Sequence, residues 1–368
     1  MRGLRKYLTP FAPDQSGAVS VLYEMGGIIV ICDAGGCTGN ICGFDEPRWF
    51  ERKSALFSAG LRDMDAILGR DDKLVEKLAS AAESLDANFA VIIGTPVPAV
   101  IGTDYQALKR MTEKKVKLPI LTVDTDGMEL YDKGAEKAWL ELLRVFAREK
   151  QEVQKGRVGI LGMTPQDISD LRAGDEMRRY MKEEKNVAAV CYGMGDGLDA
   201  VRAASSVEKN IVVAPSALEA AKYLERMFGT PYEVGYPLAF QLVPEMDYSG
   251  KNVLVVQQQV MANAIRNEII NRAPDANVQT ASWFSLKSEF RQPGDVHFRD
   301  EEDYIRLAEE GGFDVIFCRC VYAADDAGLC RDICGCAAFC GVGAAETVEM
   351  FYDTGGMKNV CRVISKSS

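Results

Sequence analysis

The chain has 368 residues, 47% of them hydrophobic, and a formal net charge of −11 at pH 7. This length suits two or three domains of about 100 to 150 residues, each with its own core. The acidic balance and the lack of a Lys/Arg block argue against a nucleic-acid partner. No apolar run approaches the ~18 residues of a membrane span, and the start MRGLRKYLTP lacks the apolar part of a signal peptide, so we expect a cytoplasmic protein.

Short apolar segments of strand length alternate along the chain with amphipathic segments of helical length. The predicted strands are 27–33, 89–94 and 119–124, then 157–162, 187–193 and 210–216, and finally 249–257, 278–284 and 311–317. In the first third, the predicted helices lie near 47–59, 71–85, 104–113 and 134–149. A charged segment at 147–157 indicates a linker, and Thr164 followed by Pro165 predicts a helix start.

This alternation is typical of doubly wound α/β units with parallel sheets. We therefore predict three Rossmann-like units in series, at 1–150, 151–248 and 249–317, with a cysteine-rich tail at 318–368.

Cys37 is the residue whose position indicates chemistry most directly. It follows Gly35 and Gly36 at the end of a predicted strand, where open α/β sheets place their ligands and glycines let the backbone turn sharply. Cys42 lies five residues further on in the same loop. Two thiolates on a glycine-containing loop suit an iron–sulfur cluster. The alternative is that both are small buried residues beside a tight turn, because free cysteine is among the most buried residue types.

Other conspicuous residues have structural explanations. Cys32 and Cys191 each lie within a predicted strand, so both are expected in the core. The segment GMGDG (193–197) looks like a dinucleotide loop but has Leu198 where the third glycine is required, which favours a plain strand-to-helix turn. His297, the one histidine, lies in a polar stretch that we expect to be a solvated loop. No P-loop motif occurs, so the chain is not expected to hydrolyse ATP by that route.

Three segments carry a resemblance to a known family. They are ICDAGGCTGNICGF (31–44), FSAGLRDMDAILGRDDKL (57–74) and GTPVPAVIGTDYQAL (94–108). In this order and spacing they resemble the amino-terminal domain of the nitrogenase component 1 family, which also includes protochlorophyllide reductase and nickel-tetrapyrrole reductase subunits. The resemblance extends over about residues 10 to 317. It implies three Rossmann-like domains and a cluster-ligating cysteine at Cys37, with an IGDD-like helix start at 101–104.

The chain departs from the family's pattern at two ligand positions. The first lies in the segment PFAPDQSGA (10–18), where Asp14 is the only plausible donor, and the second is Pro96, which cannot coordinate a metal. One chain then offers two thiolates, Cys37 and Cys42, where a cluster takes about four ligands. A symmetric homodimer would supply four, because a two-fold axis doubles every residue beside it. We therefore expect a shared iron–sulfur cluster of the 4Fe–4S type.

The tail, 318–368, holds seven of the 11 cysteines, including Cys330, Cys334, Cys336 and Cys340. These four could bind a metal, although their spacing is not that of a standard ferredoxin. When permitted codons are regrouped by one base from Phe317 onward, the segment can instead be read without a stop as one that resembles the family's carboxyl-terminal region, with an HFAVSG-like motif. A frameshifted tail is therefore favoured over a metal site or an ordinary divergent tail. Such a tail has no reason to carry helix or strand periodicity.

The resemblance implies a nitrogenase-like reductase component. It would take electrons from a separate ATP-dependent iron–sulfur reductase and pass them through a cluster at Cys37 and Cys42 to a small molecule bound between domains. The main alternative is a non-catalytic scaffold or carrier for a cluster or cofactor, which the loss of a ligand at Pro96 favours. A third is a small-molecule-binding protein without a cluster, because a fold does not fix a function.

Overall fold

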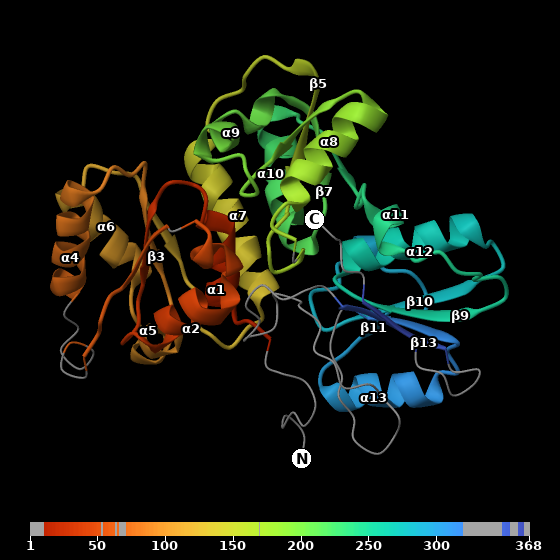
Figure 1. Cartoon of the computed structure of the whole chain (residues 1–368). Helices are drawn as coiled ribbons and strands as arrows, with labels where there is room; N and C mark the ends of the chain where they lie inside the picture. The colour runs from red at the N-terminus through yellow and green to blue at the C-terminus, as the bar shows by residue number, and fades with distance from the viewer. Residues whose placement is uncertain are drawn as a thin grey trace.

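Three α/β lobes make up the molecule, and each is built around its own sheet (Figure 1). The computed structural model describes residues 11–52, 54–62, 65, 71–168, 170–318, 348–353 and 360–363. The predicted fold class, a series of Rossmann-like α/β units with parallel strands, is confirmed. Each predicted domain is built around one sheet, and the third sheet also takes in two strands of the predicted tail. The domain boundaries themselves stay a prediction. Among the described residues, no helix combines the length and apolar character that crossing a membrane would require.

The first domain has a four-stranded parallel sheet in the order β2-β1-β3-β4. Its strands are β1 (Ile28–Ile31), β2 (Ala55–Ser58), β3 (Ala90–Ile93) and β4 (Ile120–Val123). Every residue of β1 and β3 is buried, which explains why both strands are continuous apolar runs in the sequence rather than alternating ones. The helices are α1 (Asp14–Leu22), α2 (Gly36–Asn40), α4 (Asp71–Ser84), α5 (Pro96–Ile101), α6 (Tyr105–Lys115) and α7 (Tyr131–Phe146).

The second domain has a parallel sheet in the order β6-β5-β7-β8. Its strands are β5 (Gln154–Leu161), β6 (Ala188–Cys191), β7 (Val207–Val212) and β8 (Tyr232–Val234). Its helices are α8 (Ala173–Lys185), α9 (Leu198–Arg202) and α10 (Leu218–Phe228). Gly229 ends α10 in the left-handed conformation, the common way for a helix to stop.

The third domain has a six-stranded sheet in the order β11-β10-β9-β12-β13-β14. The parallel strands are β9 (Asn252–Val256), β10 (Asn277–Ser282), β11 (Val296–His297) and β12 (Val315–Cys318), and the antiparallel ones are β13 (Val348–Asp353) and β14 (Val360–Val363). Its helices are α12 (Gln259–Arg272) and α13 (Glu301–Glu310). The short helix α11 (Ala239–Leu242) precedes the predicted boundary and packs against α12.

Helices α1 and α7 cross closely because two glycines face the crossing. A Cβ at Gly17 would lie 1.8 Å from the carbonyl oxygen of Tyr131, and a Cβ at Gly134 would lie 1.7 Å from the carbonyl oxygen of Asp14. Side chains of both helices and of α10 share one hydrophobic cluster around the fully buried Trp139. Because α10 belongs to the second domain, this shared cluster makes the cores of the first and second domains continuous.

Two helix predictions are wrong. The helix predicted at 47–59 is a short 3-10 turn, Pro47–Phe50, followed by β2, because residues 55–58 pair with β1 instead of continuing the turn. The helix predicted to start at Thr164 is a turn, and α8 begins only at Ala173. The Thr164 carbonyl oxygen accepts from the N–H groups of Asp167 (3.1 Å) and Ile168 (2.9 Å), so a single turn forms there and does not continue as a helix.

Two loop predictions are also corrected. The segment 147–157, predicted as a linker, contains the start of β5. This strand begins at Gln154, three residues before the predicted strand 157–162. His297, predicted in a solvated loop, is exposed but lies in β11, which pairs with β10 at the sheet edge.

Part of the tail departs from the expectation that it carries no strand structure. β13 pairs antiparallel with β12, and β14 pairs with β13. The segment VEMFYD of β13 is rich in apolar and aromatic residues that favour strands, and pairing covers the edge of β12. Cys330, Cys334, Cys336 and Cys340 lie outside the described residues, so the proposed metal site and the frame of the tail are not tested.

Candidate functional site

The loop that follows β1 is anchored by a buried carboxylate. Asp33 accepts hydrogen bonds from the backbone N–H of Thr38 (2.7 Å), the Thr38 hydroxyl (3.0 Å) and the Ser58 hydroxyl (2.6 Å). Gly35 has a φ of 120°, a backbone conformation that side chains rarely adopt, and this permits the turn from the strand into α2. The strand, the turn and the carboxylate therefore fix the first half of the loop.

Both predicted ligands lie on this loop and are half-buried. Cys37 is in α2, and Cys42 is in a π-helical turn, Ile41–Asp45, a feature that often occurs at functional sites. Both side chains contact the hydrophobic cluster shared by α1 and α7. An added Cβ would meet no atom within 4 Å at any of the loop glycines, which are Gly35, Gly36, Gly39 and Gly43. The loop supplies two thiols, and its glycines face open space.

The surroundings of both thiols disfavour their ionisation in the absence of a cation. Burial, and then the nearby charge of Asp33, raise the pKa of the Cys37 thiol, while a hydrogen bond with the Thr95 side chain acts in the opposite direction. Burial, followed by the charges of Glu46 and Asp33, raises the pKa of the Cys42 thiol. A bound metal ion reverses this balance, because its positive charge stabilises the thiolate.

Neither of the two departures from the family pattern supplies another ligand. Pro96 is the first residue of α5 and lies against Gly127. Asp14 is fully buried, and its carboxylate accepts hydrogen bonds from the backbone N–H groups of Gln15, Asp126 and Gly127. Across the part of the chain that the structure describes, no group of three or more His, Cys, Asp or Glu side chains could hold a metal ion. A single chain thus offers two thiols at this loop.

Exposed apolar side chains lie on the elements that flank the cysteine loop. Val100 is 81% exposed and Phe50 is 66% exposed, unusual values for large apolar residues. With them we define the apolar edge, which consists of Phe44, Phe50, Phe57, Val97, Val100 and Ile101. These residues belong to β2 and to segments that follow β1 and β3, neighbouring parallel strands whose carboxyl ends meet at one sheet edge.

The structure confirms the core positions predicted for Cys32 and Cys191 and the turn predicted at 193–197. Cys32 and Cys191 are buried, and burial is the main cause that raises the pKa of each thiol to about 12. The segment 193–197 is a turn between β6 and α9. Its Gly195 N–H donates to Glu24 (2.9 Å), and its Gly193 and Met194 N–H groups donate to carbonyl oxygens of the same turn and strand (2.9 and 3.1 Å). The N–H groups that would bind a dinucleotide phosphate are therefore already bonded within the protein.

A buried polar group where the three domains meet was missed by sequence reasoning. The Tyr131 hydroxyl on α7 donates to Asp167, which follows β5 (2.7 Å), and Asp132 accepts from the backbone N–H of Ser285, which follows β10 (2.9 Å). Burial raises the pKa of Asp167 to about 7 and is also the main cause that raises the pKa of Asp132. No sequence signal marked these aspartates, because only the domain arrangement buries them.

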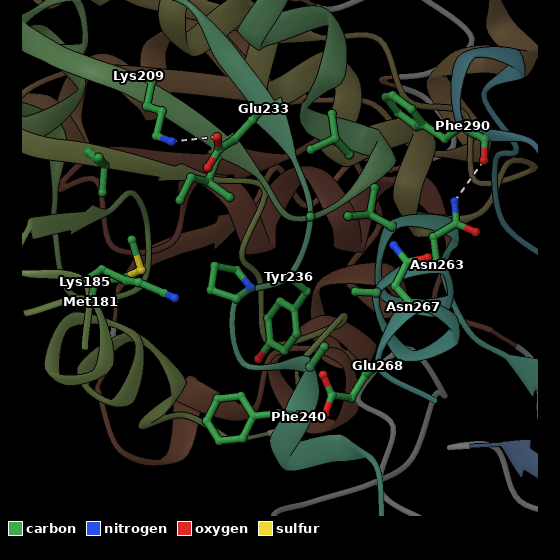
Figure 2. A pocket seen from close by; sticks show the side chains of 18 of the residues that line it. Met181, Lys185, Lys209, Glu233, Tyr236, Phe240, Asn263, Asn267, Glu268 and Phe290 are labelled. Carbon is green, nitrogen blue, oxygen red and sulfur yellow. Dashed lines mark hydrogen bonds and ion pairs between the residues drawn. The ribbon is translucent and has the colours of Figure 1, made fainter. Parts of the chain in front are cut away.

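A cleft of about 1150 Å³ lies between the second and third domains (Figure 2). Tyr236 and Phe240 extend into it, and α12 contributes Asn263 and Asn267 from the other side. The Asn263 amide donates to the carbonyl oxygen of Phe290 (2.9 Å), while its buried Oδ1 atom has no partner among the described residues. All the lining residues belong to the second and third domains, so the cleft is separate from the cysteine loop.

The three sheets and the cysteine-bearing strand-end loop define the class of protein. Residues 14–242 match the model of the nitrogenase component 1 type oxidoreductase family. The chain belongs to this family, and the resemblance found in the sequence is confirmed. A solved structure described as nitrogenase Cp1 at pH 6.5 has the same fold, with a TM-score of 0.63, 12% identity, and coverage of 86% of this chain and 82% of that one.

Two curated proteins are similar in sequence. The nitrogenase molybdenum-iron protein alpha chain of Nostoc commune is 27% identical over 150 residues, which is 38% of this chain and 50% of that protein. The nitrogenase iron-molybdenum cofactor biosynthesis protein NifE of Clostridium pasteurianum is 24% identical over 267 residues, which is 71% of this chain and 52% of that protein. The chain thus spans about half the length of these curated relatives.

Proposed function

We propose that the chain is a nitrogenase-like reductase component that holds an iron–sulfur cluster at Cys37 and Cys42 and passes electrons through it to a small molecule. The observation that carries the proposal is the pair of half-buried thiols on a glycine-rich strand-end loop. Membership of an oxidoreductase family supports it, as do relatives whose names include a molybdenum-iron protein and a cofactor biosynthesis protein.

The loop residues fit one half of a cluster site. The thiolates of Cys37 and Cys42 would bind iron, and the empty space beside the loop glycines would accommodate the inorganic part of the group. Asp33 would keep the loop in place through its bonds with Thr38 and Ser58. A bound cluster supplies one-electron redox chemistry, and burial and hydrogen bonds around the cysteine sulfurs would adjust its potential.

The other half of the site would come from a second copy of the chain. A homodimer with its Cys37 loops facing across the two-fold axis would gather four thiolates, enough for a 4Fe–4S cluster. The apolar edge beside the loop supports this arrangement, because pairing of two such edges would bury large side chains that one chain leaves exposed.

Electrons would come from a separate ATP-dependent iron–sulfur reductase, since the chain has no P-loop motif of its own. The small molecule would bind between domains. The cleft of Figure 2 is one interdomain space of sufficient volume among the described residues.

A non-catalytic scaffold or carrier for a cluster or cofactor is the second candidate. Pro96 at a family ligand position favours it, because a site with fewer protein ligands releases its cluster more readily. The similarity to a cofactor biosynthesis protein over 71% of this chain favours it as well. Such a protein would bind the cluster and transfer it without turnover.

Anaerobic purification followed by iron and sulfide analysis tests the cluster. We expect iron and acid-labile sulfide in equal amounts and a brown absorbance. Protein that stays colourless and free of iron after reconstitution would contradict both candidates. Reduction of a bound cluster by an ATP-dependent reductase, with turnover of an added substrate, supports the reductase. Transfer of the cluster to an acceptor protein without turnover supports the scaffold.

We also propose that residues 318–368 are translated out of frame. The cysteines of this tail would then be accidental products of regrouped codons. Resequencing the gene tests the idea: a single-base difference just before the Phe317 codon is the expected result. An intact frame, with metal bound at Cys330, Cys334, Cys336 and Cys340, would overturn it.

A further inference from the structure

A fully buried arginine lies directly after the cysteine loop. Arg48 is in the 3-10 turn six residues beyond Cys42, and its side chain is 2% exposed. Its guanidinium binds the Glu46 carboxylate in a bidentate manner, with Nε–Oε1 and Nη2–Oε2 distances of 2.7 Å each. Two such parallel bonds fix the plane of the guanidinium as well as its position.

The remaining donors of this guanidinium reach two other elements. Nη2 donates to the carbonyl oxygen of Ser20 in α1 (2.6 Å), and Nη1 donates to the carbonyl oxygen of Gly193 in the second domain (2.8 Å). The guanidinium also lies over the ring of Tyr23, 4.8 Å from its centroid. One side chain therefore ties the end of the cysteine loop to α1 and to the turn that follows β6.

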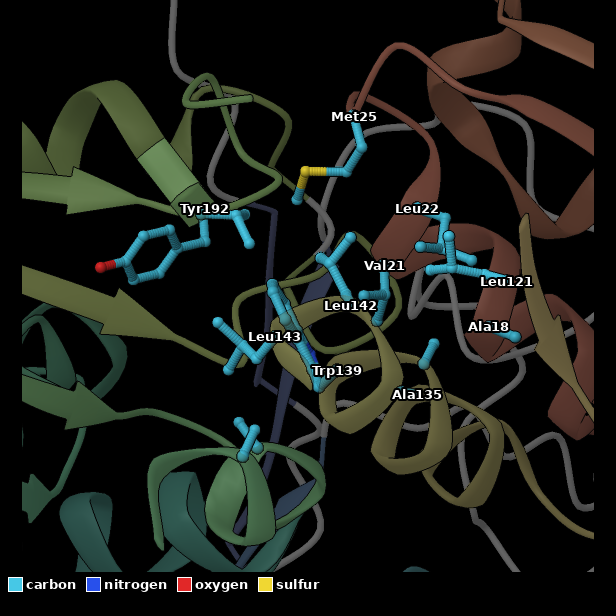
Figure 3. Packing of buried hydrophobic residues seen from close by; sticks show 14 of the residues in the cluster. Ala18, Val21, Leu22, Met25, Leu121, Ala135, Trp139, Leu142, Leu143 and Tyr192 are labelled. Atoms are coloured by element: carbon cyan, nitrogen blue, oxygen red, sulfur yellow. The ribbon is translucent and has the colours of Figure 1, made fainter. Parts of the chain in front are cut away.

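Glu24 closes a second connection to the same turn. Its carboxylate lies 3.6 Å from Arg48 and accepts a hydrogen bond from the Gly195 N–H (2.9 Å). Apolar contacts support the polar ones, since Met25 extends from the end of α1 toward the second domain near Tyr192 (Figure 3). The Gly193 turn is thus held to α1 and to the cysteine loop by the same set of side chains.

The geometry points to Arg48 and Glu46 as positioning residues that hold the Cys42 half of the cysteine loop against α1 and the second domain. The Cys37 half has its own anchor in Asp33, with bonds to Thr38 and Ser58. On the Cys42 side, the Glu46 N–H also donates to the carbonyl oxygen of Ile41 (2.9 Å), and the Asp45 carboxylate accepts from the Ser16 hydroxyl (2.7 Å). The two halves of the loop are thus held by separate sets of bonds, and those of Arg48 and Glu46 are the ones that tie the Cys42 half to the second domain.

The consequence for metal binding rests on the proposed function. A cluster requires its thiolates at fixed positions around one small core, so a loop whose second half moves independently of its first would bind iron poorly. The positioning itself does not require a metal, because all of its contacts are formed by the protein. The two claims can therefore be separated by experiment.

The test uses the full-length chain with two substitutions made together, Glu46→Gln and Arg48→Met. Removing the arginine alone would leave the Glu46 carboxylate buried without a partner, which can unfold a protein. The double variant removes both charges and retains apolar volume. Arg52→Met is the matched control, because Arg52 pairs with the same Glu24 (3.4 Å) but is 57% exposed.

The readout is alkylation of each cysteine by iodoacetamide in metal-free protein, measured by mass spectrometry of its peptides. In the double variant we expect Cys42 to react about tenfold faster than in the wild type, the change produced when local opening becomes about 1.4 kcal/mol easier. Cys37 should react at the wild-type rate, and Arg52→Met should match the wild type at both positions.

Two results would overturn the positioning role. One is a wild-type rate at Cys42 in the double variant. The other is a parallel increase at the buried Cys32 and Cys191, which would mean general unfolding instead of a released loop. Iron content after reconstitution then tests the link to the cluster. If the wild type binds no iron, the proposed function fails while the alkylation result still decides the role of Arg48.

Discussion

The first and second domains each end a strand in a turn that contains glycines and lies near a cysteine, but the two turns are used differently. After β1, Gly36 and its neighbouring glycines face open space, and Cys37 is half-buried. After β6, a Cβ at Gly195 would lie 2.5 Å from the guanidinium of Arg178, and Cys191 is completely buried. One turn leaves room for a ligand and the other is filled by the protein.

The difference arises from what lies next to each strand end. The turn after β6 is covered by the end of α1 and by the Arg178 side chain, which also pairs with Asp196 (2.9 Å). The loop after β1 is bordered by the apolar edge, which one chain leaves exposed. Glycine spacing alone therefore does not distinguish a binding loop from a structural turn. The distinction depends on whether other parts of the protein cover the end of the strand.

The largest expected effect is the loss of the cluster when a cysteine of the loop after β1 is replaced. Cys37→Ser should abolish the brown absorbance and most of the iron of anaerobically purified protein, because a hydroxyl is a far poorer ligand for iron than a thiolate. Cys191→Ala, beside the turn after β6, is the matched control and should retain the iron. Iron analysis decides the comparison, and wild-type iron content in Cys37→Ser would refute the assigned site.

A charge on the apolar edge should have the next largest effect. Val100→Asp places a carboxylate at a position that is 81% exposed in the single chain, so the subunit itself should fold normally. Burying that charge in a dimer interface would be unfavourable, and we expect a monomer with little iron. Met227→Asp on α10, at a position 55% exposed, is the control that should stay dimeric. Light scattering after gel filtration measures both, and a dimeric Val100→Asp protein would place the interface elsewhere.

Burial of Asp167 at the domain junction should make stability depend on pH. Its pKa is about 7 in the folded protein against 3.8 for the ordinary group, so the native state binds the proton more tightly than the unfolded chain. The free energy of unfolding should therefore fall as pH rises from about 4 to about 7, by about 2–4 kcal/mol from this group. Urea unfolding at pH 5 and pH 8 should show this fall in the wild type.

The same measurement on Asp167→Asn should show a smaller pH dependence, because the amide does not ionise. Asp199→Asn, a change at a residue whose side chain is 94% exposed, should leave the wild-type dependence intact. An unaltered pH dependence in Asp167→Asn would mean that other groups control the stability of the junction.

Local sequence patterns predicted the strands well. The apolar runs at 27–33 and 89–94 correspond to β1 and β3, because strands buried on both faces must be apolar throughout. The helix predicted at 47–59 failed for the opposite reason. β2 is a short edge strand with a mixed burial pattern, so its identity depends on pairing with β1, which no local pattern records.

The candidate site was predictable only in part. Strand, glycines and cysteines are contiguous in sequence, so Cys37 and Cys42 could be assigned together to one loop. Arg48 could not be assigned, because its partners at Ser20 and Gly193 are distant in sequence and a lone arginine suggests a solvated surface. Asp167 was missed for the same reason: only the meeting of three domains buries it.

The smallest expected effects come from the glycines themselves, and they test the comparison most directly. Gly195 has a φ of 104°, so Gly195→Ala should destabilise the fold by about 1–2 kcal/mol through backbone strain. Gly36 has no positive φ and no atom within 4 Å of an added Cβ, so Gly36→Ala should leave the free energy of unfolding nearly unchanged. Urea unfolding of metal-free protein measures both changes. A bulkier Gly36→Leu variant should fold equally well but lose iron, because its side chain would fill the space proposed for the cluster. Equal destabilisation at the two glycines would mean that the loop after β1 is as closely packed as the turn after β6, and the contrast between the two strand ends would not hold.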